Sequence, residues 1–248
     1  MTAVPAEGPP DWSAMPPPSG HRALSVALAA ALVVAGAACS SDREAASAPA
    51  FGTVPGTVPT GPLPPPLATT AQVPIDTVAM VGDSITVGSQ AALEEGFGTL
   101  GLDDAVINAE SGRRMIAGTG ITSGLEAVDE ITAGGTSPDL WVVALGTNDV
   151  ANYRPADYAD VIGALLADIP ADAPVVWVDT YLEEYRDLSS QFNDVLRRVL
   201  AARGHATVVD WASIAAEDGV LTDGVHPSGF GVQEFTRRIV AAVDSWQA

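Results

Sequence analysis

Short apolar runs alternate with amphipathic helical patterns from about residue 75 to the end of the chain. Between the runs, apolar residues recur every three or four positions, as Ile162, Leu165 and Ile169 do, which is typical of one buried helix face. Strands that alternate with helices predict a parallel sheet covered by helices on both faces. The predicted strands are rich in β-branched residues and span 76–82, 104–110, 139–146, 174–180 and 206–211.

Residues 1–39 read as a leader with a signal peptide. The unbroken apolar stretch 23–38 is shorter than the roughly 20 residues of a membrane-spanning helix, but it suits the apolar core of a secretory signal. Small residues before Cys39 and polar residues after it resemble a bacterial lipobox, with Gly36 where leucine is usual. We therefore expect export, with Cys39 lipidated on the outer face of the cell membrane. An ordinary cleaved signal or an uncleaved anchor helix is the alternative.

Residues 40–74 are dominated by Ser, Ala, Thr, Gly and Pro and show no apolar periodicity. Such a composition cannot build a core and predicts a disordered, partly polyproline tether. Residues 75–248 carry all the strand and helix patterns and form the predicted globular domain.

The charge of the chain excludes one class of partner. All 11 basic residues are arginine, against 31 acidic ones, and residues 75–248 alone carry 9 arginines and 27 acids, a formal charge of −18. A nucleic-acid partner is excluded because little is present to neutralise phosphates. Cys39 is the single cysteine, so neither an intrachain disulfide nor a cysteine zinc site can form.

Polar residues follow the predicted strands. Ligands of such sheets bind at the carboxyl ends of the strands, so these positions are where a site is expected. The blocks are "GDS" ending at Ser84, "SG" ending at Gly112, "GTND" containing Asn148, and a late "DGVH" containing Asp223 and His226.

These residue types can together perform acyl transfer. Ser84 offers a hydroxyl at a strand-to-helix turn, and His226 is a candidate base for its proton. Asp223 lies three residues before His226, close enough to orient the imidazole. Asn148 can donate from its amide, and Gly112 allows a backbone N–H to approach an oxyanion closely. The alternative for Ser84 is a simple helix N-cap.

The four blocks together resemble the SGNH hydrolase superfamily, also called the GDSL family. The resemblance extends over about residues 75–248. It implies a flavodoxin-like, three-layer α/β/α sandwich with a five-stranded parallel sheet, in agreement with the alternation of strands and helices. It implies neither a cofactor nor a metal ion.

The resemblance also implies residue roles. Ser84 would be the nucleophile, His226 the base and Asp223 its orienting partner. The oxyanion hole would be formed by the N–H of Ser84, the N–H of Gly112 and the side chain of Asn148.

The expected activity is hydrolysis of carboxylic esters with short acyl or acetyl groups, on small molecules or on envelope carbohydrates. Two alternatives stay open: an envelope O-acyltransferase, and an envelope-binding lipoprotein whose hydrolase fold is no longer catalytic. The adjacent Arg113 and Arg114 are expected to be solvated or paired with nearby acids; the alternative is that one binds an anionic substrate group.

Overall fold

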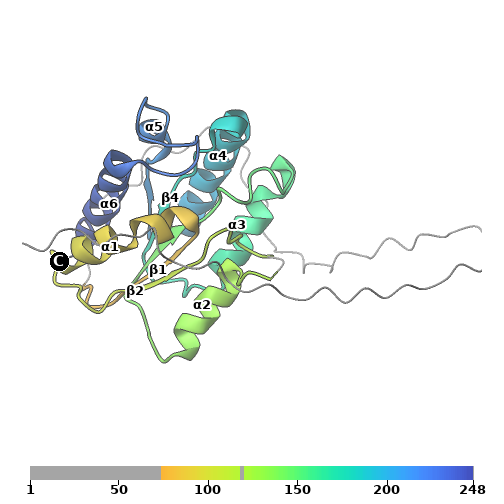
Figure 1. Ribbon diagram of the computed structural model, residues 1–248. Helices are drawn as coiled ribbons and strands as arrows, with labels where there is room; N and C mark the ends of the chain where they lie inside the picture. The colour runs from red at the N-terminus through yellow and green to blue at the C-terminus, as the bar shows by residue number, and fades with distance from the viewer. Residues whose placement is uncertain (1–73, 118–119, 248) are drawn as a thin grey trace, which may run out of the picture. The chain divides into compact units, whose positions relative to one another are not determined.

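A parallel sheet forms the centre of the domain in the computed structural model, which describes residues 74–117 and 120–247 (Figure 1). Its five strands lie in the order β2-β1-β3-β4-β5, and every neighbouring pair is parallel. The fold predicted from the sequence is confirmed, with each strand shorter than its apolar run. The strands are β1 (Val78–Gly82), β2 (Val106–Ala109), β3 (Leu140–Ala144), β4 (Val175–Val178) and β5 (Ala206–Val209).

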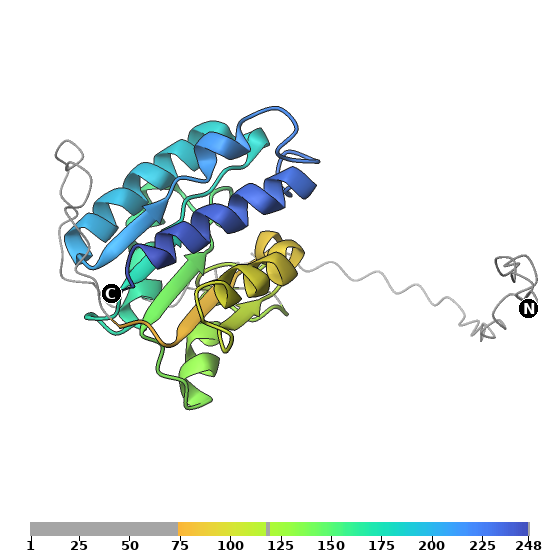
Figure 2. The same cartoon turned by 90° about the vertical axis from the view of Figure 1, so that its left-hand side faces the viewer.

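Helices cover both faces of this sheet, as Figures 1 and 2 show. One face is covered by α1 (Ser84–Gly98), the short α5 (Ala212–Ala215) and α6 (Gly229–Asp244). The other is covered by α2 (Gly124–Ala133), α3 (Tyr158–Ala167) and α4 (Arg186–Arg203). Two short 3₁₀ helices, η2 (Pro155–Asp157) and η3 (Glu183–Tyr185), precede α3 and α4. None of the helices described is long and apolar enough to cross a membrane.

The alternation of side chains along each strand produces two separate cores. In β3, Trp141 and Val143 face the layer of α2, α3 and α4, whereas Val142 faces α1 and α6. Trp141 and Trp177 are fully buried and belong to the core. Burial on both faces explains why the strands read as continuous apolar runs rather than as an alternating pattern.

The strand order reverses between β1 and β3. From β1 the chain moves outward to β2, then crosses back to pair β3 on the other side of β1. A crevice opens at the carboxyl ends of the strands at such a reversal, and ligands bind there in folds of this type. The predicted leader with Cys39 and the predicted tether lie outside the described residues.

Candidate active site

Ser84 and His226 meet at the carboxyl edge of the sheet, although 142 residues separate them in the chain. Ser84 is the first residue of α1, and His226 lies in the loop before α6. The Oγ of Ser84 is 3.0 Å from Nε2 of His226, and Nδ1 of the same ring is 2.8 Å from Oδ2 of Asp223. A hydroxyl, an imidazole and a carboxylate are thus connected in series within hydrogen-bond distance.

Asp83, not Ser84, caps helix α1. The Oδ1 of Asp83 accepts a hydrogen bond from the N–H of Ile85 at 3.0 Å, so the alternative in which Ser84 is the N-cap is wrong. The preceding Gly82 is required by space: a Cβ there would lie 2.0 Å from Oγ1 of Thr86. The turn therefore releases the Ser84 hydroxyl from capping and directs it toward His226.

The loop that carries His226 is held by its own carboxylate. The Oδ1 of Asp223 accepts from the N–H groups of Val225 and His226 at 3.0 and 2.7 Å, leaving Oδ2 for the imidazole. The hydrogen bonds from the His226 main chain and side chain hold the pKa of Asp223 at about 2, so its carboxylate is ionised at neutral pH. Ser228 then caps α6 by accepting from the N–H of Gly231.

Gly112 lies in a tight turn directly after β2. The turn is closed by a 3.2 Å hydrogen bond from the N–H of Arg113 to the carbonyl of Glu110. Gly112 has φ of +81°, a conformation that side-chain-bearing residues rarely adopt, which explains glycine at this position.

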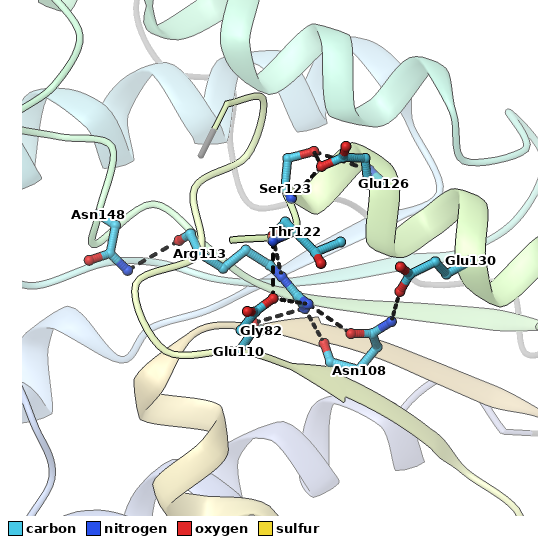
Figure 3. A network of polar contacts seen from close by, with 9 residues as sticks. All are labelled: Gly82, Asn108, Glu110, Arg113, Thr122, Ser123, Glu126, Glu130 and Asn148. Atoms are coloured by element: carbon cyan, nitrogen blue, oxygen red, sulfur yellow. Dashed lines mark hydrogen bonds and ion pairs between the residues drawn. The ribbon is translucent and has the colours of Figure 1, made fainter. Parts of the chain in front are cut away.

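Asn148 connects the turn after β1 with the turn after β2. Its Nδ2 donates to Oδ2 of Asp83 at 3.2 Å and to the carbonyl of Arg113 at 3.1 Å (Figure 3 draws the second bond). An amide nitrogen carries two N–H groups, so both have acceptors here. Both bonds are at the long end of the usual range. An oxyanion placed beside Asn148 would share or replace one of them.

Two buried carboxylates lie behind these turns. Burial raises the pKa of Asp83 to about 6, and burial also raises that of Asp149 to about 7, with a further contribution from the negative charge of Asp83. The Oδ1 of Asp149 accepts from the N–H of Met115 at 3.1 Å, whereas its Oδ2 is buried without a hydrogen-bond partner among the described residues. Both side chains hold the site loops by hydrogen bonds.

Arg113 pairs with a nearby acid, which is one of the two expectations from the sequence: Oε2 of Glu110 is 3.6 Å from its Nη2. The other expectation, a solvated side chain, does not apply, because Arg113 is only 2% exposed. The guanidinium reaches main-chain carbonyls instead (Figure 3). The sequence "GRR" does not indicate that Arg113 is buried, because the path of the loop decides which of the two arginines points inward.

Two apolar side chains that are close in sequence to Ser84 and His226 are exposed. Val87 lies one turn after Ser84 in α1 and is 42% exposed. Phe230 lies four residues after His226, in the first turn of α6, and is 56% exposed. Both apolar surfaces are therefore available for further contacts.

Comparison with known proteins finds one matching family model and solved structures with a similar fold. The model of the GDSL-like lipase/acylhydrolase family matches residues 80–233. No curated protein matches the sequence. Within the described residues, no group of three or more His, Cys, Asp or Glu side chains is arranged to hold a metal ion.

Two solved structures have a similar fold. The catalytic domain of peptidoglycan O-acetyltransferase A from Streptococcus pneumoniae is 19% identical with a TM-score of 0.52, over 70% of this chain and 93% of that one. An acetyl xylan esterase variant from Geobacillus stearothermophilus is 16% identical with a TM-score of 0.51, over 71% of this chain and 98% of that one. At these identities the likeness establishes the fold alone.

Proposed function

Since the chain belongs to the GDSL-like lipase/acylhydrolase family, we propose that this ester hydrolase uses Ser84 as its nucleophile, His226 as its base and Asp223 to orient the base. One observation carries the proposal: the unbroken series from the Ser84 hydroxyl through the imidazole to the Asp223 carboxylate, at 3.0 and 2.8 Å. Such a series is what activates a serine hydroxyl, whose own proton is too tightly held at neutral pH.

The reaction then follows from these contacts. The Ser84 Oγ attacks the ester carbonyl while Nε2 of His226 takes its proton, and the ionised Asp223 stabilises the resulting imidazolium. The alcohol leaves with the proton returned by His226, and the acyl group stays on Ser84. A water molecule, deprotonated by the same imidazole, hydrolyses this acyl-enzyme and restores the serine.

The oxyanion formed in both steps requires donors at the same edge of the sheet. We assign the N–H of Ser84, the N–H of Gly112 and the amide of Asn148 to this role. The N–H of Ser84 lies at the amino end of α1, where the helix dipole favours negative charge. The two long hydrogen bonds of Asn148 can exchange for a shorter, charge-assisted one to the oxyanion.

For the substrate we propose esters of short acyl groups, with acetyl groups on envelope carbohydrates as the first to examine. Export and the lipid anchor at Cys39, both inferred from the sequence, would bring the domain to such polymers. The formal charge of −18 on residues 75–248 disfavours anionic phospholipid surfaces by simple repulsion. Transfer of the acyl group to a sugar hydroxyl instead of water uses the same acyl-enzyme and is the second candidate function, since one fold neighbour is an O-acetyltransferase.

The test uses a fluorophosphonate probe and a series of p-nitrophenyl esters from acetate upward. We expect the probe to label Ser84, and Ser84→Ala to lose both labelling and hydrolysis while its unfolding temperature stays close to that of the wild type. Hydrolysis that survives in Ser84→Ala would overturn the proposal. Absence of labelling in a folded wild-type protein would favour a fold that is no longer catalytic. Release of free acetate and transfer to added oligosaccharide, measured side by side, separate hydrolase from transferase.

A further inference from the structure

Arg113 is the side chain that ties together the loops of the candidate oxyanion hole. Its guanidinium is buried at 2% exposure and donates to three main-chain carbonyls from three parts of the chain. Its Nε donates to Thr122 at 3.0 Å, and its Nη1 donates to Gly82 at 3.2 Å and to Asn108 at 2.6 Å.

The remaining donors of Arg113 are also used. Nη2 donates to Oδ1 of Asn108 at 2.8 Å and lies 3.6 Å from Oε2 of Glu110. A guanidinium has five N–H groups in one plane, and here each has an acceptor or a carboxylate within reach (Figure 3). A lysine has three donors on a single atom and could not reach the same set.

The position of Arg113 relates it to each of the three proposed oxyanion donors. It binds the carbonyl of Gly82, two residues before Ser84. It directly follows Gly112, and its own N–H donates to the carbonyl of Glu110 at 3.2 Å, which closes the turn that contains the Gly112 N–H. Its own carbonyl accepts from Nδ2 of Asn148 at 3.1 Å. Movement of this one residue would displace all three donors together.

We propose that Arg113 is a positioning residue for the oxyanion hole, holding the donors of Ser84, Gly112 and Asn148 in register without touching the substrate. The inference rests on the proposed function. It predicts that weakening the Arg113 contacts lowers the rate of the chemical steps and leaves the binding of the uncharged ester almost unchanged, because only the transition state carries the oxyanion charge.

The test is Arg113→Lys in the full-length chain, assayed with p-nitrophenyl acetate and a fluorophosphonate probe. We expect kcat to fall by about 10- to 100-fold with KM within about twofold of the wild type, somewhat less than the loss of a whole oxyanion donor. The rate constant of phosphonylation should fall in parallel, since that reaction also builds charge on an oxygen in the same hole. Rates are expressed per folded molecule, measured by the unfolding transition.

Arg203→Lys is the matched control. Arg203 is partly buried and, like Arg113, binds main-chain carbonyls, including those of Pro170 at 2.7 Å and Ala173 at 3.0 Å. These carbonyls lie just before β4, at the opposite edge of the sheet from Ser84. We expect Arg203→Lys to lower stability while kcat per folded molecule stays at the wild-type value.

If Arg113→Lys does not fold, Asn108→Ala replaces it, because this change removes one acceptor of Arg113 and leaves the arginine in place. A several-fold fall in kcat with unchanged KM would then support the proposal. Wild-type kcat in the folded variant, or an equal fall in Arg203→Lys, would overturn it. Ser84→Ala distinguishes a failure of the proposed function from a failure of the positioning role. If Ser84→Ala stays active, the proposed function is wrong. If Ser84→Ala is inactive but Arg113→Lys has a normal kcat, only the positioning role is wrong.

Discussion

The carboxylate of Asp83 accepts a hydrogen bond from the amide of Asn148 at 3.2 Å, which joins the cap of α1 to the loop after β3. The same carboxylate holds the first turn of the helix through Ile85. The residue that sets the direction of Ser84 therefore also orients the amide beside it. A substitution at either position is expected to disturb the other, and measured effects at Asp83 and Asn148 should not be additive.

Replacing Asn148 with alanine should lower kcat by about 10²–10³-fold, as for the loss of one oxyanion donor elsewhere. The amide contributes mainly when negative charge develops, so KM for a neutral ester should change little. Steady-state kinetics with p-nitrophenyl acetate distinguishes the two parameters. A rise in KM with unchanged kcat would instead assign Asn148 to ground-state binding.

Replacing Asp223 with asparagine should lower kcat by about 10²–10⁴-fold. The new side chain can keep Oδ1 as acceptor for the N–H groups of Val225 and His226, but at the imidazole it presents a donor where a carboxylate had accepted. The ring is then held in the wrong tautomer. Asp218→Asn is the control, since this exposed acid lies in the same part of the chain. Equal losses in both variants would contradict a specific role for Asp223.

The contribution of Asp149 to the free energy of unfolding should fall as the pH rises from about 4 to about 7. Burial raises the pKa of Asp149 in the folded chain to about 7, above its ordinary value of 3.8, so the folded state holds a proton that the unfolded state releases. Its stabilising contribution is complete below about pH 4 and is lost as the pH passes 7, at roughly 1.4 kcal/mol for each pH unit between the two pKa values.

Asp149→Asn removes this titration while retaining an oxygen acceptor for Met115. We therefore expect the variant to gain stability relative to the wild type at pH 8 compared with pH 5, measured by urea unfolding at both values. The difference between the two proteins isolates Asp149 from Asp83, whose raised pKa gives a slope of the same sign. A difference that does not change with pH would show that Asp149 titrates normally.

Phe230→Ser should weaken the binding of a butyryl ester more than that of an acetyl ester. Phe230 is 56% exposed and lies four residues after His226 in the chain, and contact with an apolar acyl chain would remove part of that surface from water. We expect KM for p-nitrophenyl butyrate to rise about fivefold, with a smaller change for the acetate. Phe230→Leu, which keeps an apolar surface, should leave KM for the butyrate close to the wild-type value. Equal changes for acetate and butyrate would indicate that Phe230 does not contact the acyl chain.

The sheet could be predicted from the sequence because each strand is marked by its own apolar run, and five such runs point to the same fold. β3 is a continuous apolar run that only a strand buried on both faces would have. Ser228 could be placed as a cap because the periodic face of α6 begins directly after it. The loops at the strand ends can be located because glycines interrupt the apolar runs, as Gly82 does at the end of β1 and Gly146 does after β3.

The details of the site were less accessible. Ser and Asp are equally good caps, so propensity does not decide between Asp83 and Ser84, and the structure shows that Asp83 accepts from the N–H of Ile85. The burial of Arg113 depends on carbonyls contributed by three segments, and main-chain acceptors are invisible in a sequence. Charged residues next to a glycine turn are usually exposed, and the loop path decides otherwise here.

The hydroxyl and imidazole belong to opposite ends of the described domain: Ser84 follows the first strand, and His226 precedes the last helix. A chain that stops before the loop preceding α6 carries the nucleophile without its base. On the proposed mechanism, an incomplete or partly unfolded molecule is inactive. It gains hydrolytic activity only when its C-terminal segment packs onto the sheet and brings His226 to Ser84. Ester turnover would then serve as a direct reporter of complete folding, more stringent than secondary structure content.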